Sequence, residues 1–347
     1  MVENRLQVRV DQEGRDLADS LRIAPWPYNE ENVTTKRSKA MTRHQLKGRW
    51  FDAGTAAFER VFPGARAKRF PEIENPYICP LCAQPYPRAA IADGTLTFED
   101  APPKSYGGKP VALSCKHCNN ALGSSLDAPL STLDGNEMSP CRLGIDGVEV
   151  IAYQEIRPDG RFFAIPENQN NPSHRAQFFK GLEKVTHQPP GQLTYKRDMV
   201  KRRRADLAWL KAAYIVAFAR WGYSYAFSPA LRVVREQLRR PGEEIIRQFK
   251  LENRKSPRDT RFIIYIREPR ELEGVAVGMG HHIVLLPADA RDMTIYDRLD
   301  AALKGNPSLS LTGDTYYWPT SPTYSIDFVP FDSVLVSPTP GEVRMLS

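Results

Sequence analysis

The sequence has no long hydrophobic run. Nowhere in its 347 residues does an apolar stretch reach the roughly 18 residues that a membrane-spanning helix requires. The most apolar segment, 212–227, is interrupted by Arg220 and follows Lys211, so it is typical of a buried helix. The first residues carry charges throughout and show no secretory signal. We therefore expect a cytoplasmic protein without a membrane partner.

The sequence is also poor in cysteine. Its five cysteines do not fit the disulfide framework of a small secreted domain. Four of them form two pairs of identical spacing, Cys79 with Cys82 and Cys115 with Cys118. In a reducing compartment, such pairs predict thiolate ligands for a metal ion. The fifth, Cys141, stands alone, and we expect it to be a small, partly buried residue.

The cysteine spacing predicts a structural zinc site. Two residues separate the cysteines of each pair, and 32 residues separate Cys82 from Cys115. Tetrahedral Zn²⁺ needs four soft ligands at about 2.3 Å, and two such turns supply them without leaving a position for water. The alternative is a pair of unrelated turns, one of them redox-active, but the surrounding sequence lacks the helical context of a redox motif.

Charge and composition fit an ordinary globular protein. Hydrophobic residues make up 41% and charged residues 26% of a chain that is long enough for two or three domains. The formal net charge of +7 favours a polyanionic partner such as nucleic acid over the alternative, a surface whose charge only keeps the protein in solution.

Hydrophobic periodicity divides the chain into three predicted segments. The first, 1–75, contains a helix that ends before Pro63 and Gly64. The second, 76–140, holds the cysteines, with strands predicted over 94–100 and 109–115 and a helix over 119–133. The third, 141–347, reads as a mixed domain around a long central helix, so the predicted fold class is α+β. Its predicted strands are 191–200, 260–268, 274–288, 309–319 and 323–331, with a hairpin over 147–166 and helices over 173–185, 205–223, 228–240 and 241–250.

One stretch of the second segment resembles a known family. The text "EDAPPKSYGG", "LSCKHCNN" and "GSSLDAPL", within Cys79 to Leu130, resembles the four-cysteine branch of the HNH endonucleases. The resemblance implies a treble-clef-like ββα-metal fold, in which a hairpin and a helix hold a catalytic Mg²⁺ or Mn²⁺ beside the structural zinc. It also implies a metal-dependent, bacterial-type endonuclease that hydrolyses phosphodiester bonds in DNA, with nucleic-acid defence as the expected setting.

The resemblance also implies roles for individual residues. Glu99 and Asn119 match the positions that bind the catalytic ion, and Asp100 matches the position of the histidine that activates water. Asn120 also matches the motif, and Asp127 matches it as a possible further ligand. These expectations cover the predicted nuclease-like segment and not the rest of the chain.

Aspartate at position 100 leaves three alternatives. An unperturbed aspartate titrates near pH 3.9 and a histidine near 6.5, so Asp100 is the weaker base unless burial or Glu99 raises its pKa. Asp100 is then a base with a raised pKa, a second metal ligand, or the mark of a degenerate nuclease that binds without cutting. The last alternative makes the protein a zinc-knuckle module that binds nucleic acid or another protein.

Several further residues are candidates for contact with a partner. Lys104 follows the acidic pair and is well placed in the sequence to meet a backbone phosphate. The densest basic run comprises Lys201, Arg202, Arg203 and Arg204. Tyr316, Tyr317 and Trp318 either stack bases or belong to a core, and we expect His117 to be exposed in its knuckle. DNA is the expected partner with RNA not excluded, and the 141–347 segment is a candidate site for a protein partner.

Overall fold

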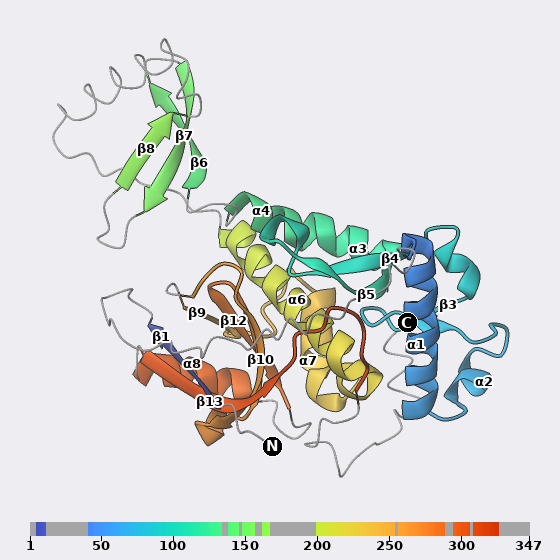
Figure 1. Ribbon diagram of the computed structural model, residues 1–347. Coiled ribbons are helices and arrows are strands. Elements are labelled where there is room, and N and C mark those ends of the chain that lie inside the picture. Colours follow the sequence, from blue (N-terminus) through green and yellow to red (C-terminus); the bar gives the residue numbers. More distant parts are fainter. Residues whose placement is uncertain are drawn as a thin grey trace, which may run out of the picture. The chain divides into compact units, whose positions relative to one another are not determined.

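The computed structural model shows a mixed α+β protein (Figure 1). In the part of the chain that it describes, no helix is both long and apolar enough to cross a membrane. The residues described are 5–11, 41–133, 138–145, 148–156, 162–166, 199–253, 256–288, 294–305 and 308–325.

The chain forms two compact units that do not follow the three predicted segments. One unit combines Met1–Gly123 with Leu207–Ser347, and the other is the insertion Ser124–Asp206. The part of the predicted second segment that holds the four paired cysteines, up to Gly123, therefore shares its unit with Leu207–Ser347 and is called the cysteine segment below. The physical reason lies in helix α6, whose buried part from Leu207 onward bonds directly to the backbone of the cysteine segment.

A six-stranded antiparallel sheet forms one layer of the first unit. Its strands are, in spatial order, β1 (Arg5–Asp11), β13 (Ser308–Tyr316), β10 (Arg261–Glu268), β11 (Gly274–Met279), β12 (His282–Pro287) and β9 (Lys250–Glu252). The strands predicted over 260–268 and 309–319 are confirmed, whereas the single strand predicted over 274–288 is in fact two. Gly280 turns the chain between them with a φ of 62°, so His281 and His282 lie at a hairpin turn.

Other elements also differ from the prediction. No helix forms over 241–250, because the side chain of buried Gln237 holds that backbone in a loop. Its Oε1 accepts from the amides of Ile245 and Ile246, and its Nε2 donates to the carbonyl of Glu243. Helix α8 (Ile295–Gly305) and strand β1 were not predicted. The predicted strand 191–200 and helix 173–185 lie outside the described residues, except that Met199 and Val200 are helical.

Helix α1 (Arg43–Val61) agrees with its prediction and starts at a capping box. The Thr42 hydroxyl accepts from the Gln45 amide, and the Gln45 side chain accepts from the Thr42 amide at 2.8 Å. These two bonds satisfy donors that a helix start otherwise leaves without a partner. The first turn therefore has a fixed position, and it carries Arg43 and His44. Short helix α2 (Ala65–Arg69) follows.

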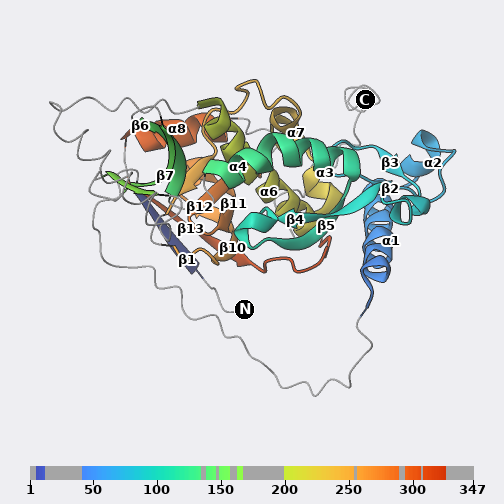
Figure 2. The same cartoon turned by 90° about the horizontal axis from the view of Figure 1, so that it is seen from above.

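Helix α6 (Met199–Ala226) is the centre of the first unit from Leu207 onward. Its residues there are buried on all sides, which explains why the sequence shows no polar face. Tyr214 and Tyr223 donate to the carbonyls of Pro80 and Ile78 at 2.7 and 2.6 Å. Tyr225 instead donates to the large sheet, to the carbonyl of Pro287 in β12 at 2.8 Å. Figure 2 shows α6 between the β4–β5 hairpin and the sheet; helix α7 (Arg232–Arg239) follows it.

The cysteine segment is built from short elements. In chain order they are β2 (Tyr77–Ile78), β3 (Pro85–Tyr86), η1 (Arg88–Ile91), β4 (Leu96–Ala101), η2 (Lys104–Tyr106), β5 (Lys109–Cys115) and α3 (Lys116–Leu122). Strands β4 and β5 pair antiparallel, with a bulge between Glu99 and Asp100. The tight turn before β5 needs glycine at 108, where a Cβ would lie 1.6 Å from the Pro102 carbonyl oxygen. The predicted order of strand, loop, strand and helix is thus confirmed.

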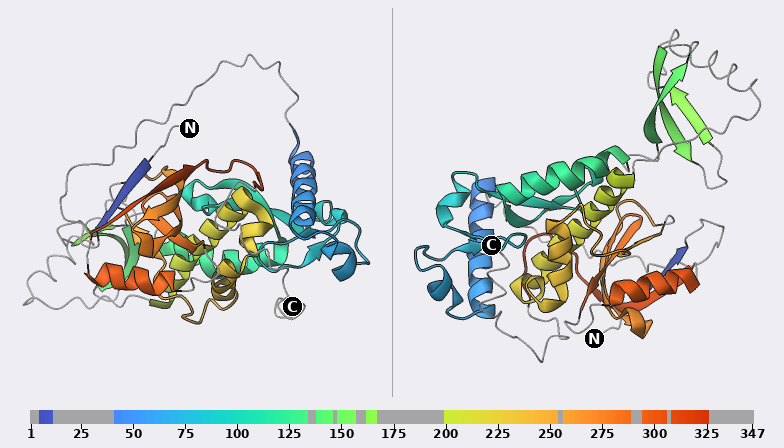
Figure 3. Two further views of the ribbon diagram at one scale, coloured as in Figure 1. Left: turned by 90° about the horizontal axis from the view of Figure 1, so that it is seen from below. Right: turned by 180° about the vertical axis from the view of Figure 1, so that it is seen from behind.

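The second unit contains a small antiparallel sheet of β6 (Met138–Ile145), β7 (Val148–Ile156) and β8 (Phe162–Pro166), drawn in green in Figure 3. The hairpin predicted over 147–166 corresponds to β7 and β8, and β6 adds a third strand. Before this sheet, a single π-helical turn, η3 (Gly123–Asp127), leads into α4 (Ala128–Leu133). The helix predicted over 119–133 is therefore helical throughout but changes its winding at Gly123.

Candidate metal centre and adjacent pocket

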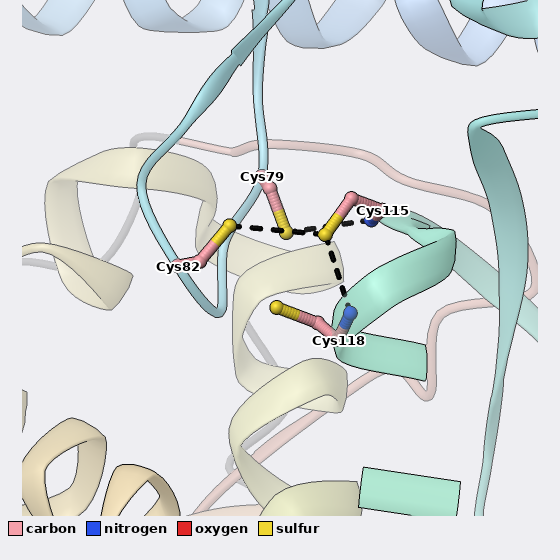
Figure 4. Close-up of side chains that lie close together, drawn as sticks. All are labelled: Cys79, Cys82, Cys115 and Cys118. Carbon is pink, nitrogen blue, oxygen red and sulfur yellow. Dashed lines mark hydrogen bonds between the residues drawn. The ribbon is translucent and has the colours of Figure 1, made fainter. Parts of the chain in front are cut away.

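The four paired cysteines come together in one cluster. Their sulfur atoms all lie within 4.8 Å of one another. Figure 4 shows Cys79 and Cys82 on the loop after β2, facing Cys115 at the end of β5 and Cys118 in the first turn of α3. The residues are thus positioned to bind a metal ion, as their spacing predicted.

The donor set fits zinc in tetrahedral coordination. With Zn–S bonds of about 2.3 Å, neighbouring sulfurs should be about 3.8 Å apart. The Sγ atoms of Cys82 and Cys115 are 3.8 Å apart. Backbone amides also point at the sulfurs: Cys115 N lies 3.4 Å from Cys79 Sγ, and Cys118 N lies 3.3 Å from Cys115 Sγ. Such N–H donors stabilise thiolates, so the geometry is consistent with a structural zinc site.

Electrostatics also favour a cation in the cluster. Burial raises the pKa of the Cys79 thiol well above its usual range, and the neighbouring sulfurs act in the same direction. Four adjacent sulfurs in a buried setting cannot all ionise without a compensating charge. A bound divalent cation supplies that charge, and its binding free energy then contributes to the folding of this segment.

Glu99 is close to this cluster in the sequence but has a different environment. Its side chain is 2% exposed, and its Oε1 lies 2.9 Å from Nζ of Lys211 on α6, which is 1% exposed. Its other oxygen, Oε2, accepts a hydrogen bond from the Ser114 hydroxyl on β5. Both carboxylate oxygens are therefore engaged by the protein, one with the Lys211 ammonium and one with the Ser114 hydroxyl. These contacts do not support the predicted Mg²⁺ or Mn²⁺ site.

Asn119 uses its amide group to bind the neighbouring strand. Its Nδ2 donates to the Thr97 hydroxyl at 3.0 Å and to the Phe98 carbonyl at 2.9 Å. These bonds fix α3 against β4. In this arrangement Asn119 positions the hairpin, and the predicted sharing of an ion between Asn119 and Glu99 gains no support. Asn120 is exposed one residue further along α3.

Asp100 faces an open pocket of about 390 Å³, away from the buried pair. Helix α1 lines it with Arg43, His44 and Lys47, and the remaining lining residues are Ile91, Thr97, Phe98 and Asp100. Arg43 and Lys47 lie 5.2 and 5.5 Å from the centre of the Phe98 ring. The pocket thus combines an arginine, a lysine and a histidine with one carboxylate, a charge balance that favours an anion over a metal ion.

The pKa of Asp100 is raised, as one of the three alternatives requires. Burial is the largest cause and the negative charge of Glu99 adds to it, whereas Lys104, Arg43 and Lys211 act in the opposite direction. Burial also lowers the pKa of Lys47, with Arg43 contributing. Ammonium Nζ of Lys47 donates to the Leu96 carbonyl at 2.8 Å, which holds α1 against β4.

The remaining candidates are placed as follows. Lys104 is exposed on η2, and His117 is exposed on α3 as expected. Asp127 ends the π-helical turn η3 in the second unit. The basic run Lys201, Arg202, Arg203 and Arg204 is helical, at the start of α6 in the second unit. Cys141 lies on β6.

Sequence reasoning missed the cation that pairs with Glu99 and the cations that line the pocket beside Asp100. Lys211 was noted only as the residue before an apolar run, although a lysine within a buried helix requires a carboxylate partner. That requirement is a usable signal, but it does not identify Glu99 as the partner. Arg43, His44 and Lys47 recur on one face of α1 at helical spacing, yet the prediction followed only the apolar stripe of that helix.

Three comparisons with known proteins found no match: no family model, curated protein or solved structure matches the chain. The functional interpretation therefore depends on the contacts described above. They comprise a metal-type sulfur cluster, a carboxylate neutralised by an internal lysine and a cationic pocket beside a second carboxylate.

Proposed function

We propose that the protein is a zinc-stabilised nucleic-acid-binding protein whose HNH-like module binds phosphate groups without cleaving them. In this proposal the four cysteines hold zinc and fix the β4–β5 hairpin against α3. The cationic pocket at the start of α1 receives a backbone phosphate. The module is thus a degenerate form of the ββα-metal fold, with DNA as the first substrate to test and RNA as the second.

The observation that carries this proposal is the ion pair of Glu99 with Lys211. Phosphodiester hydrolysis of the HNH type needs a divalent cation with open positions for a phosphate oxygen and for water. Here the carboxylate that should hold that cation already has a cationic partner at 2.9 Å, and both side chains are almost fully buried. Displacing the lysine would leave an ammonium group without a partner inside the protein, at a cost of several kcal/mol.

The pocket beside Asp100 supports the binding half of the proposal. Arg43 and His44 are exposed in the first turn of α1, where the helix dipole adds positive potential. Lys104 adds a further cation, close enough to Asp100 to lower its pKa. Contacts of this kind bind phosphate regardless of base sequence, and their affinity falls as salt concentration rises.

A metal-dependent DNA endonuclease is the second candidate, and one observation favours it. Asp100 lies in an accessible pocket with a raised pKa, which is what a general base in place of histidine requires. That function needs a catalytic Mg²⁺ or Mn²⁺ whose ligands would include Glu99, and therefore a rearrangement of Lys211. The two candidates make opposite predictions for the same assay.

The test combines cleavage and binding on one protein preparation. Purified zinc-loaded protein is incubated with supercoiled plasmid in Mg²⁺ and in Mn²⁺, and binding to a fluorescent duplex is followed by anisotropy at several salt concentrations. We expect binding that weakens with salt and no nicking with either metal ion. Nicking that is lost in both Glu99→Gln and Asp100→Asn would establish the endonuclease instead.

The variant Asp100→Asn separates the two candidates further. If the pocket only binds phosphate, removing a negative charge beside the ligand tightens binding. If Asp100 is a catalytic base, the same variant loses cleavage while it retains binding. Arg43→Ala is the matched variant on the opposite wall, and we expect it to weaken binding and to reduce the salt dependence by about one phosphate contact.

A further inference from the structure

The aromatic residues at the end of β13 are divided between core and surface. Tyr316 packs edge-on against Trp221 of α6, with ring centroids 5.4 Å apart. Tyr317, the next residue, is instead 74% exposed. Trp318 is half-buried, and the guanidinium of Arg261 lies 6.0 Å from its ring centre. A tyrosine this exposed beside a partly exposed tryptophan is a feature that the core does not require.

Arg261 connects these aromatic residues to the loop between β4 and β5. Its Nη2 donates to the carbonyl of Tyr106 at 2.9 Å. Tyr106 in turn packs edge-on against Trp209 of α6, with ring centroids 4.9 Å apart, so the loop is held at this place. Lys104 is exposed in the same short helix, η2. Trp318 therefore lies beside an arginine that is bonded to the loop following the acidic residues of the module, and Tyr317 is its neighbour in the sequence.

Positive charge is found both near this loop and near the pocket at α1. Lys104 and Arg43 both lower the pKa of the Asp100 carboxyl against the rise that burial causes, so both cations lie near this carboxylate. Exposed Arg258 adds another cation near Arg261, to which its carbonyl is bonded, and Asp259, also exposed, adds a carboxylate near Arg261. Cations are thus present both near Asp100 and near Trp318.

We propose that Tyr317 and Trp318 form an aromatic platform on which unpaired bases stack, so that the protein prefers single-stranded over double-stranded nucleic acid. This inference rests on the proposed nucleic-acid-binding function and names its substrate class. The cations would follow the backbone of the strand, while the platform would accept its bases. Paired bases in a duplex are stacked on one another and do not present a free face to such a platform, whereas every unpaired base does.

The test compares three fluorescein-labelled ligands by anisotropy: a 20-nucleotide thymidine strand, the same strand with abasic sites, and a 20-base-pair duplex. Wild type should bind the thymidine strand more tightly than the other two. Because stacking on one aromatic side chain contributes about 1–3 kcal/mol, Tyr317→Ala should weaken binding of that strand about 5- to 150-fold. The same variant should leave binding of the abasic strand and the duplex unchanged.

Two further variants control for charge and for folding. Tyr317→Phe keeps the ring and should retain the affinity of wild type, whereas Tyr317→Leu should behave like Tyr317→Ala. Lys104→Ala should weaken binding of all three ligands and reduce the salt dependence, while Lys68→Ala, an exposed lysine of α2, should have little effect. Equal melting temperatures across the tyrosine variants would show that the fold is intact.

The outcomes separate this inference from the function on which it rests. Equal affinity for strand and duplex, with no effect of Tyr317→Ala, would overturn the aromatic platform while the nucleic-acid-binding function stands. No binding of any of the three ligands at low salt would overturn the function and the platform together. A loss of affinity in Tyr317→Ala that is equally large for the abasic strand would also contradict stacking.

Discussion

The cysteine cluster and the Glu99–Lys211 pair both contact strand β5, through Cys115 and through Ser114, but they neutralise buried charge in different ways. In the cluster, four sulfur atoms lie within 4.8 Å of one another and are positioned to bind a metal ion. In the pair, a carboxylate is neutralised by a lysine of the protein at 2.9 Å. One site therefore needs an external cation to be stable, and the other carries its own.

Under the proposed function, this difference separates the fold of the segment from nuclease chemistry. In that proposal the fold depends on zinc at the four cysteines and on the hydrogen bonds that fix the hairpin and α3, and not on a catalytic ion. The chemistry depends on an accessible carboxylate. An internal ammonium removes that access and stabilises the packing of α6 against β4.

Loss of a zinc ligand should have the largest effect of any change considered. Structural zinc in small modules contributes about 10–16 kcal/mol of binding free energy that is also folding free energy. We expect Cys115→Ser to lose the metal and to unfold the segment around the cluster. Zinc content by atomic emission and thermal melting measure this. Cys141→Ser is the control and should retain one zinc per chain; loss of zinc from the control alone would contradict the assignment.

Breaking the buried pair should have the next largest effect. Lys211→Met leaves the Glu99 carboxylate buried without its cation, which typically costs about 3–5 kcal/mol. The double variant Glu99→Gln/Lys211→Met removes both charges and should recover much of that loss. Urea unfolding of the single and double variants measures the coupling free energy between the Glu99 and Lys211 side chains. Equal destabilisation in Lys211→Met and in the double variant would show that the two side chains are not coupled.

Removing one hydroxyl between α6 and the cysteine loop should cost less. Tyr214→Phe deletes the hydrogen bond to the Pro80 carbonyl, and each such bond contributes about 0.5–1.5 kcal/mol. We expect a small loss of stability together with faster release of zinc to a chelator. Tyr317→Phe, which alters an exposed hydroxyl, should change neither quantity. Identical zinc release from wild type and Tyr214→Phe would mean that α6 does not support the cluster.

The smallest effect concerns pH and Asp100. Its folded-state pKa is raised, mainly by burial, so folding favours the neutral carboxyl. The associated stability is complete below the unfolded pKa, about 3.9, and is lost as the pH rises through the folded pKa. Asp100→Asn should therefore match wild type at the acid end and become the more stable protein above it. A stability difference that does not vary with pH would contradict a raised pKa.

The sequence predicts the cluster well because its information is local. The two residues between the cysteines of each pair determine a turn that brings both sulfurs to one side, whatever the rest of the chain contacts. The hairpin of β7 and β8 was predictable for the same reason, from Pro158, Asp159 and Gly160 between two strand-like runs. These elements agree with the prediction because their conformation depends on residues that are close to one another in the sequence.

What the sequence could not predict depends on contacts between distant parts of the chain. The environment of Glu99 is determined by Lys211, and nothing in the motif around Glu99 specifies a lysine on another helix. The loop over 241–250 has helix-forming residues, but its backbone is bonded to the side chain of Gln237. The exposure of Tyr317 next to buried packing of Tyr316 is likewise a result of how β13 ends.

A manganese titration tests the central claim most directly. Zinc-loaded wild-type protein and Glu99→Gln are titrated with Mn²⁺ up to millimolar concentration, and bound ion is measured by electron paramagnetic resonance. The account predicts one zinc per chain and no stoichiometric Mn²⁺ in either protein, because Lys211 already neutralises Glu99. One tightly bound Mn²⁺ per wild-type chain that is absent in Glu99→Gln would contradict it.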